Sequence, residues 1–179
     1  DEKSKNKLRK KLSVSPGEGL NISTRRKDEY IKEMKQFCSK FTRPGGDKLF
    51  SCGSGRGGGC VDAYGAFQPC LMLRDPGTAY DLKVGSLKDA LTNFFPKVRA
   101  IKTTNPEYLA RCAQCFLKGF CEQCPAKSWT EHHTLDTPVE YLCKVAHMKA
   151  RFLGLIKDDE KAWEVKEWKK RIETFCSKT

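Results

Sequence analysis

Signals for membrane insertion and for export are missing from this chain of 179 residues. It contains no run of about eighteen apolar residues, so the sequence predicts no transmembrane helix. The first residues are charged and lack the apolar segment of a signal peptide, so nothing marks the chain for export. We therefore expect a cytoplasmic protein without a membrane partner.

Signals for nucleotide binding and for histidine-rich metal sites are also weak. The Gly-rich segment 52–60 lacks the lysine followed by Ser or Thr that defines a phosphate-binding loop. The chain has only three histidines, which are His132, His133 and His147. They could serve as zinc ligands, but we expect surface or core positions for all three.

Positive charge is plentiful, with a formal net charge of +12. Basic proteins often bind nucleic acid or other polyanions. Here, however, Lys and Arg are spread along the chain, and Asp and Glu are interleaved with them, as in 157–161. Interleaved charges are typical of solvated helix faces, so we expect no nucleic-acid partner. Residues 1–12 concentrate six basic residues and are predicted to form a frayed basic arm.

Cysteine is the abundant residue, with ten in the chain. Without an export signal, this number favours metal or redox chemistry over disulfides. Four of the ten lie within residues 112–124, in two C-x2-C pairs separated by five residues. Thiolates are soft ligands that suit zinc or iron–sulfur clusters.

The spacing within this run helps to choose between the two metals. Zinc ribbons place their C-x2-C pairs ~15–20 residues apart, whereas only five residues separate them here. Bacterial ferredoxins use a crowded run in which the cysteine before a proline binds a different cluster, and Cys124 precedes Pro125. The spacing favours iron–sulfur clusters, with four-cysteine structural zinc as the alternative.

The sequence predicts an α+β fold, with a small β-hairpin and cysteine-rich loops around two metal clusters, flanked by several helices. Apolar periodicity predicts helices over about 25–42, 138–156 and 159–175. A loop is expected at 15–19, a hairpin that turns before Gly65 at 61–70, and a short helix from Ser86 that ends at Pro96.

Two cysteines are predicted not to bind metal. Cys38 lies on the apolar stripe of the first long helix, with Tyr30 and Phe41, and is expected in the core. Cys176 follows the last helix and is expected as a frayed thiol. Eight cysteines remain, which is enough for two sites of four ligands each.

The order of these cysteines resembles the SPASM domain, a C-terminal extension of radical S-adenosylmethionine enzymes. Cys52, twelve residues to Gly65 and four residues to Cys70 are similar to its opening motif. The run 112–124 resembles its middle motif, with a last gap one residue shorter than usual, and Cys143 matches the closing cysteine. The resemblance covers about residues 48–147.

The resemblance implies two auxiliary [4Fe-4S] clusters and assigns their ligands. Auxiliary cluster I would use Cys52, Cys60, Cys70 and Cys124. Auxiliary cluster II would use Cys112, Cys115, Cys121 and Cys143. Such enzymes modify peptides or proteins, so the implied partners are a peptide or protein substrate and an electron donor or acceptor protein. Arg56 and Arg74 are expected to favour the reduced state of the nearby cluster.

The resemblance also separates this chain from a complete enzyme. A radical-generating cluster needs C-x3-C-x2-C, which does not occur here, and the βα repeats of a barrel are missing. We expect S-adenosylmethionine and a third [4Fe-4S] cluster in a barrel outside this chain. Residues 1–47 would then be a basic arm and linker helix at the end of that barrel, 48–147 the auxiliary-cluster domain and 148–179 C-terminal helices.

Two other functions stay open from the sequence. The first is a basic structural zinc module that contacts nucleic acid or protein. The second is a small ferredoxin-like electron carrier that acts alone.

Overall fold

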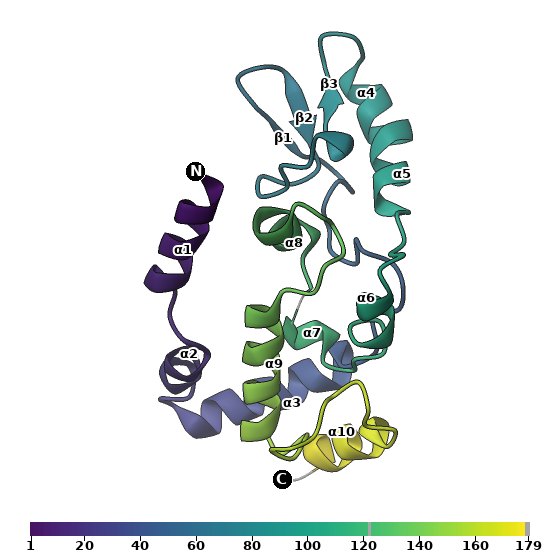
Figure 1. Cartoon of the computed structure of the whole chain (residues 1–179). Coiled ribbons are helices and arrows are strands. Elements are labelled where there is room, and N and C mark those ends of the chain that lie inside the picture. Colours follow the sequence, from purple (N-terminus) through teal and green to yellow (C-terminus); the bar gives the residue numbers. More distant parts are fainter. Residues whose placement is uncertain (122, 178–179) are drawn as a thin grey trace. The chain divides into compact units, whose positions relative to one another are not determined.

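The computed structural model describes residues 1–121 and 123–177, without the side chains of residues 2, 3, 6, 9 and 10. The side chains of Lys3, Arg9 and Lys10, predicted for the basic arm, lie outside this description, as do residue 122 of the cysteine-rich run and tail residues 178–179. The fold is α+β, as predicted, with helices and one three-stranded antiparallel sheet (Figure 1). No helix of the described part is long and apolar enough to cross a lipid bilayer.

The chain divides into two compact units, each built from separate stretches of sequence. Unit 1 comprises Asp1–Pro44, Gln114–Glu122 and Glu140–Thr179, and unit 2 comprises Gly45–Ala113 and Gln123–Val139. The predicted three-segment organisation stays a prediction. Unit 1 contains α1 (Glu2–Leu12), α2 (Pro16–Ser23), α3 (Lys27–Phe41), α7 (Lys118–Cys121), α9 (Glu140–Phe152) and α10 (Trp168–Ser177).

The amino-terminal part of unit 1 is more helical than predicted. The frayed arm is α1, and the expected loop at 15–19 is the first part of α2. Ser15 and Glu18 form a capping box: the Ser15 hydroxyl accepts the Glu18 N–H at 3.3 Å, and the Glu18 carboxylate accepts the Ser15 N–H at 3.0 Å. Pro16 fits the first helical turn, where no intrahelical N–H donor is needed. These interactions override the turn-like composition of the segment.

The core of unit 1 lies where α3, α9 and α10 pack with the segment that precedes α7. The helix predicted at 25–42 is confirmed as α3, and the helix predicted at 138–156 is confirmed, with shorter bounds, as α9. Tyr30 and Cys38 of α3 are buried, as expected. Phe41, however, is 51% exposed, so the prediction that it belongs to the buried stripe is wrong.

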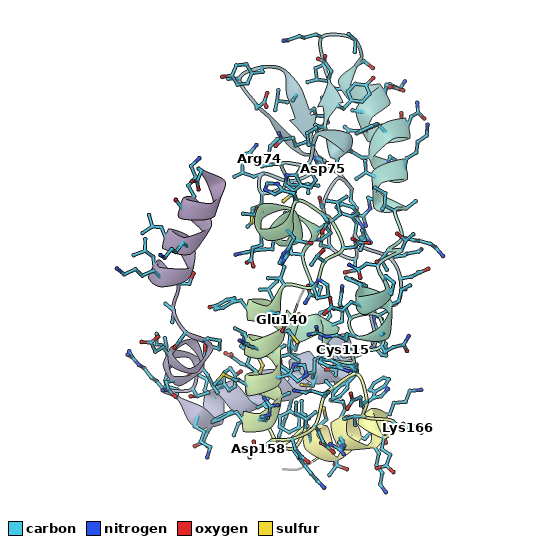
Figure 2. The ribbon with its side chains drawn as sticks, viewed as in Figure 1. Arg74, Asp75, Cys115, Glu140, Asp158 and Lys166 are labelled. Atoms are coloured by element: carbon cyan, nitrogen blue, oxygen red, sulfur yellow. The ribbon has the colours of Figure 1, made fainter. Side chains whose placement is uncertain are left out.

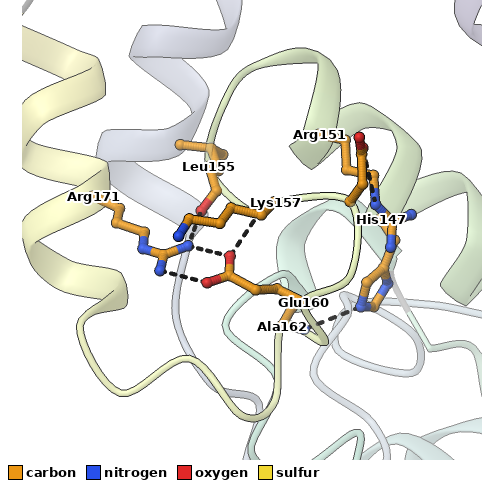
Figure 3. A network of polar contacts seen from close by, with 8 residues as sticks. His147, Arg151, Leu155, Lys157, Glu160, Ala162 and Arg171 are labelled. Carbon is orange, nitrogen blue, oxygen red and sulfur yellow. Dashed lines mark hydrogen bonds and ion pairs between the residues drawn. The ribbon is translucent and has the colours of Figure 1, made fainter.

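The last predicted helix is shorter than expected, because α10 begins only at Trp168. The residues before it form turns, held by a fork between Glu160 and Arg171 (Figure 3). Arg171 Nη2 donates to Glu160 Oε1 at 2.8 Å, and the Lys157 N–H donates to Glu160 Oε2 at 2.7 Å. Arg171 also donates to the Leu155 carbonyl at 3.3 Å. The Glu160 carboxylate thus accepts hydrogen bonds from a guanidinium and from a backbone N–H, and these bonds stabilise the turn in place of a helix.

This fork predicts a loss of stability in acid. Hydrogen bonds from Arg171 and from the Lys157 backbone lower the pKa of Glu160 from 4.5 to about 2. A carboxyl group with a lowered folded-state pKa stabilises the fold above pH 4.5, and this contribution is lost as the pH falls toward 2. We expect Glu160→Gln to lower the urea midpoint at pH 7 and to approach the wild type at pH 3, measured by anaerobic urea titration.

The exposed Glu173 on α10 gives a matched control. Glu173→Gln also removes one negative charge, but it leaves the hydrogen bonds between Glu160 and Arg171 in place. The explanation fails if Glu160→Gln lowers the midpoint at pH 3 as much as at pH 7.

Unit 2 contains the sheet and short helices. Its elements are β1 (Cys60–Val61), β2 (Ala66–Gln68), η1 (Pro76–Thr78), β3 (Tyr80–Asp81), α4 (Leu87–Asp89), η2 (Ala90–Phe94), α5 (Phe95–Arg99), α6 (Pro106–Ala110) and α8 (Pro125–His132). The predicted hairpin is confirmed: β1 pairs antiparallel with β2, and Cys60 lies opposite Gln68. Its turn ends at Gly65, whose φ of 86° suits glycine.

The helix predicted from Ser86 begins as expected but does not end at Pro96. Ser86 caps α4 by accepting the Asp89 N–H at 3.1 Å. The chain then widens into the π-helical segment η2 and continues as α5 to Arg99. Proline lacks an N–H donor, and a π turn just before it accommodates the missing hydrogen bond. Phe95 of α5 packs on Phe67 of β2, with ring centroids 4.8 Å apart.

Candidate metal centre

Three of the four cysteines predicted for auxiliary cluster I lie on adjacent segments of unit 2. The loop after Cys52 is tied to the residue before Cys70, since Gly55 N–H and the Ser54 hydroxyl donate to the Pro69 carbonyl at 3.0 and 3.1 Å. Sheet pairing adds the third, because it places Cys60 opposite Gln68, two residues before Cys70. Backbone hydrogen bonds therefore gather the segments that carry these thiols.

The Gly-rich loop approaches β2 too closely for a larger residue. A Cβ at Gly59 would lie 2.2 Å from the Gln68 carbonyl oxygen and 2.8 Å from Phe67 Cε2. Gly57 and Gly58, in contrast, have open space. Close packing therefore requires glycine at position 59, directly before the predicted ligand Cys60 at the start of β1.

Arg99 anchors this loop and was not found by sequence reasoning. Its Nη1 donates to the Cys52 carbonyl at 2.9 Å and also to the Ser54 carbonyl. Cys52 and Arg99 are 47 residues apart, and neither lies on a periodic pattern that would pair them. A guanidinium bound to the backbone of a predicted ligand fixes the loop and brings positive charge to it.

Arg56 and Arg74, the two arginines suggested by the sequence, have no hydrogen bond to the backbone of a predicted ligand among the described contacts. Arg74 donates to the side chain of the buried Gln68 at 2.6 Å and lies beside Asp75 in the turn after β2 (Figure 2). Arg56 is exposed on the Gly-rich loop. Their predicted influence on a cluster stays a prediction.

Cys124, the fourth residue predicted for auxiliary cluster I, also lies in unit 2. It is the N-cap of α8, followed by Pro125 at the first helical position. Cys124 and Cys70 both pack, half-buried, against the same core, which contains Leu73, Tyr108 and Cys112. The four predicted ligands therefore share one unit.

The cysteines predicted for auxiliary cluster II are distributed differently. Cys115 (Figure 2) and Cys121 are buried in the core of unit 1, and Cys143 lies half-buried on α9 of the same unit. Cys112 is buried in unit 2, and its assignment to this cluster stays a prediction.

Helix α7 is tightly packed in the core of unit 1. Lys118 is only 8% exposed, and it has interaction partners in this buried position. Gly119 lies against the end of α3, where a Cβ would be 2.6 Å from the Phe41 carbonyl oxygen. Glycine allows this close approach, and α7 carries Cys121 at its last position.

Cys143 has a histidine one helical turn after it. Cys143 Sγ lies 3.5 Å from His147 Nδ1, and the same nitrogen lies 2.9 Å from the Cys143 carbonyl oxygen. His147 is 5% exposed, which confirms the expected core position. The arrangement brings a ring nitrogen to the sulfur of the predicted closing ligand.

The two cysteines left outside the predicted sites pack in the core of unit 1. Cys38 is 1% exposed, and burial raises the pKa of its thiol to about 11, so it forms a poor thiolate ligand. The prediction of a frayed Cys176 is wrong. This residue is half-buried on α10, and its thiol donates to the Lys35 carbonyl at 3.4 Å. The packing of α10 on α3 orders it.

In the described part of the chain, no three His, Cys, Asp or Glu side chains are grouped closely enough to hold a metal ion. All ten cysteines belong to that part, and none of them forms a disulfide. The segments that carry Cys52, Cys60 and Cys70 are adjacent, but the sulfur atoms of these residues would have to move together to bind a metal cluster. Metal binding that draws ligands together in this way is coupled to local folding.

Comparison with known proteins gave no assignment: no protein-family model, no curated protein and no solved structure matches the chain.

Proposed function

We propose that the chain is the auxiliary iron–sulfur module of a radical S-adenosylmethionine enzyme that modifies a peptide or protein. The observation that carries this proposal is the set of hydrogen bonds that join the Cys52 loop to the residue before Cys70. A tetrathiolate site needs cysteines from separate segments brought to one place, and these hydrogen bonds bring two such segments together.

The eight cysteines would supply four thiolates to each of two [4Fe-4S] clusters, and their sulfurs would have to converge on binding. Auxiliary cluster I would be held by Cys52, Cys60, Cys70 and Cys124, and auxiliary cluster II by Cys112, Cys115, Cys121 and Cys143. When bound, such clusters accept and donate single electrons at potentials set by nearby charge, burial and hydrogen bonds. The substrate would be a peptide or protein, with a redox protein as electron donor or acceptor. Thiolate ligands of this kind suit a reducing compartment such as the cytoplasm.

Residues of unit 2 would favour an anionic cluster in two ways. Arg99 holds the Cys52 loop by two backbone carbonyls and brings positive charge to it. Gly57 and Gly58 are exposed with open space beside them, so the backbone there could approach a cluster closely.

The test is anaerobic quantification of iron, sulfide and zinc in the full chain after reconstitution, with Mössbauer spectroscopy. We expect roughly eight irons and eight sulfides per chain, as two [4Fe-4S] clusters require. Cys121→Ala and Cys52→Ala should each lose about half of the iron, and each should remove a different cluster signal. Cys38→Ala, at a cysteine without a proposed ligand role, should keep the full content.

Other results identify the alternatives. A colourless protein that binds zinc through these cysteines would establish the structural zinc module instead. Loss of all iron in both Cys121→Ala and Cys52→Ala would contradict two independent sites.

A further inference from the structure

Cys38 and Cys176, the two cysteines without a proposed ligand role, lie on two helices that pack on each other, α3 and α10. The Cys176 thiol donates to the Lys35 carbonyl of α3, with 3.4 Å between sulfur and oxygen. In an α-helix a carbonyl accepts from the residue four positions later and therefore points toward the next turn. Cys38 lies on that turn, three residues after Lys35. The Cys176 sulfur is thus seated beside the turn of α3 that carries Cys38.

The surroundings of the two thiols agree with this placement. Cys38 belongs to the apolar core of unit 1 and is 1% exposed, and the half-buried Cys176 packs against the same core. Burial is the main cause that raises the pKa of the Cys38 thiol to about 11, and interaction with an ionised Cys176 contributes. Because Coulomb interactions weaken with distance, the two thiols lie within electrostatic reach of each other.

We propose that Cys38 and Cys176 form a reversible disulfide in the presence of glutathione disulfide, and that this bond locks α10 onto α3. Both residues are free thiols in the structure, which is the reduced state of the pair. A disulfide needs Cα atoms about 4.4–6.8 Å apart. Cys176 lies in the last turn of α10, and helix ends fray more readily than helix interiors, so this turn can adjust to that separation.

The bond forms by two thiol–disulfide exchange steps. The Cys176 thiolate, on the more accessible of the two residues, attacks glutathione disulfide, forms a mixed disulfide and releases one glutathione thiolate. The Cys38 thiolate then attacks the Cys176 sulfur and releases the second glutathione thiolate. The two thiol protons pass through solvent to the released thiolates. The two cysteines together lose two electrons, and one glutathione disulfide gains them and becomes two glutathione molecules.

The bond would connect two distant points of the chain. Residues 39–175, which include all of unit 2, lie between the two cysteines. A cross-link across a long segment removes conformational freedom from the unfolded chain and so stabilises the folded state. It also prevents α10 from separating from α3. The pair would therefore make the stability of unit 1 depend on the redox state of the surroundings.

The experiment treats the full chain with glutathione disulfide under anaerobic conditions and blocks the remaining thiols with iodoacetamide. Tryptic digestion without reductant followed by mass spectrometry should then find fragment 36–40 joined to fragment 172–178, since these carry Cys38 and Cys176. We expect the urea midpoint of the oxidised protein to rise by about 1 M. Dithiothreitol should reverse both changes.

Cys176→Ser is the matched variant, because its hydroxyl can donate to the Lys35 carbonyl as the thiol does. It should keep the urea midpoint of the reduced wild type but show no rise after treatment with glutathione disulfide. Mapping of the linked fragments in the wild type tests the pairing even if a variant does not fold.

Three results would overturn the proposal. The first is a wild-type protein in which iodoacetamide still labels both cysteines after oxidation. The second is a lasting mixed disulfide on Cys176, or a bond from either cysteine to another residue. The third is a Cys176→Ser variant whose urea midpoint rises as much as that of the wild type. Neither cysteine is a proposed cluster ligand, so these outcomes are separate from the iron content that tests the proposed function.

Discussion

Gly59→Ala is expected to destabilise unit 2 and to impair assembly of auxiliary cluster I. The added methyl group would lie 2.2 Å from the Gln68 carbonyl oxygen, which is a backbone atom in the β1–β2 pairing and cannot rotate away. Overpacking of this kind costs about 1–3 kcal/mol and shifts the backbone. We expect a lower urea midpoint and a lower iron content at auxiliary cluster I, measured anaerobically.

Gly58→Ala is the matched control, because the space beside the neighbouring glycine is open. It changes the same loop by the same atom and should retain both stability and iron. Equal behaviour of the two variants would mean that β1 does not hold its register against β2 in solution.

Phe116→Ala is expected to have the largest effect on unit 1. Phe116 is fully buried (0% exposed), and its ring stacks on Trp168 at 5.9 Å with planes at 10°. Removing a buried aromatic ring costs about 3–5 kcal/mol in free energy of unfolding, because the cavity left behind does not close completely. Anaerobic urea denaturation, followed by tryptophan fluorescence, measures the change.

Phe41→Ala serves as the control for the same chemical change on the surface. Phe41 is half exposed, and surface substitutions usually change stability by about 0.5 kcal/mol. A Phe116→Ala variant as stable as Phe41→Ala would show that the segment between Cys115 and α7 is not packed as described.

The elements that sequence predicted well carry a local signal. Helix α3 has apolar residues at intervals of three and four, and the hairpin has an Asp62-to-Gly65 turn in which the Gly65 N–H donates to the Asp62 carbonyl at 3.2 Å. Helix α2 was missed because its glycine and proline content indicates a turn, while the Ser15–Glu18 capping box stabilises a helix.

The candidate site was predictable only as a list of cysteines. Their order led to a proposal of two sets of four ligands, but it does not indicate which side chains approach them. Arg99 reaches Cys52 across 47 residues, and the Ala162 N–H that donates to His147 Nε2 lies in a turn where a helix was predicted. Such contacts depend on tertiary packing, which leaves no periodic or motif signal in the sequence.

The discontinuous build of unit 1 has a consequence during synthesis on the ribosome. Helix α3 packs on α10, so residues 42–167 must be translated before the apolar side chains of α3 can meet this partner. Unit 2, which ends at Val139, can become complete first. A nascent chain in this state presents an uncovered helix face, and exposed apolar surface promotes aggregation. Translation stalled before α10 should therefore yield a chaperone-bound product in which unit 1 remains unfolded.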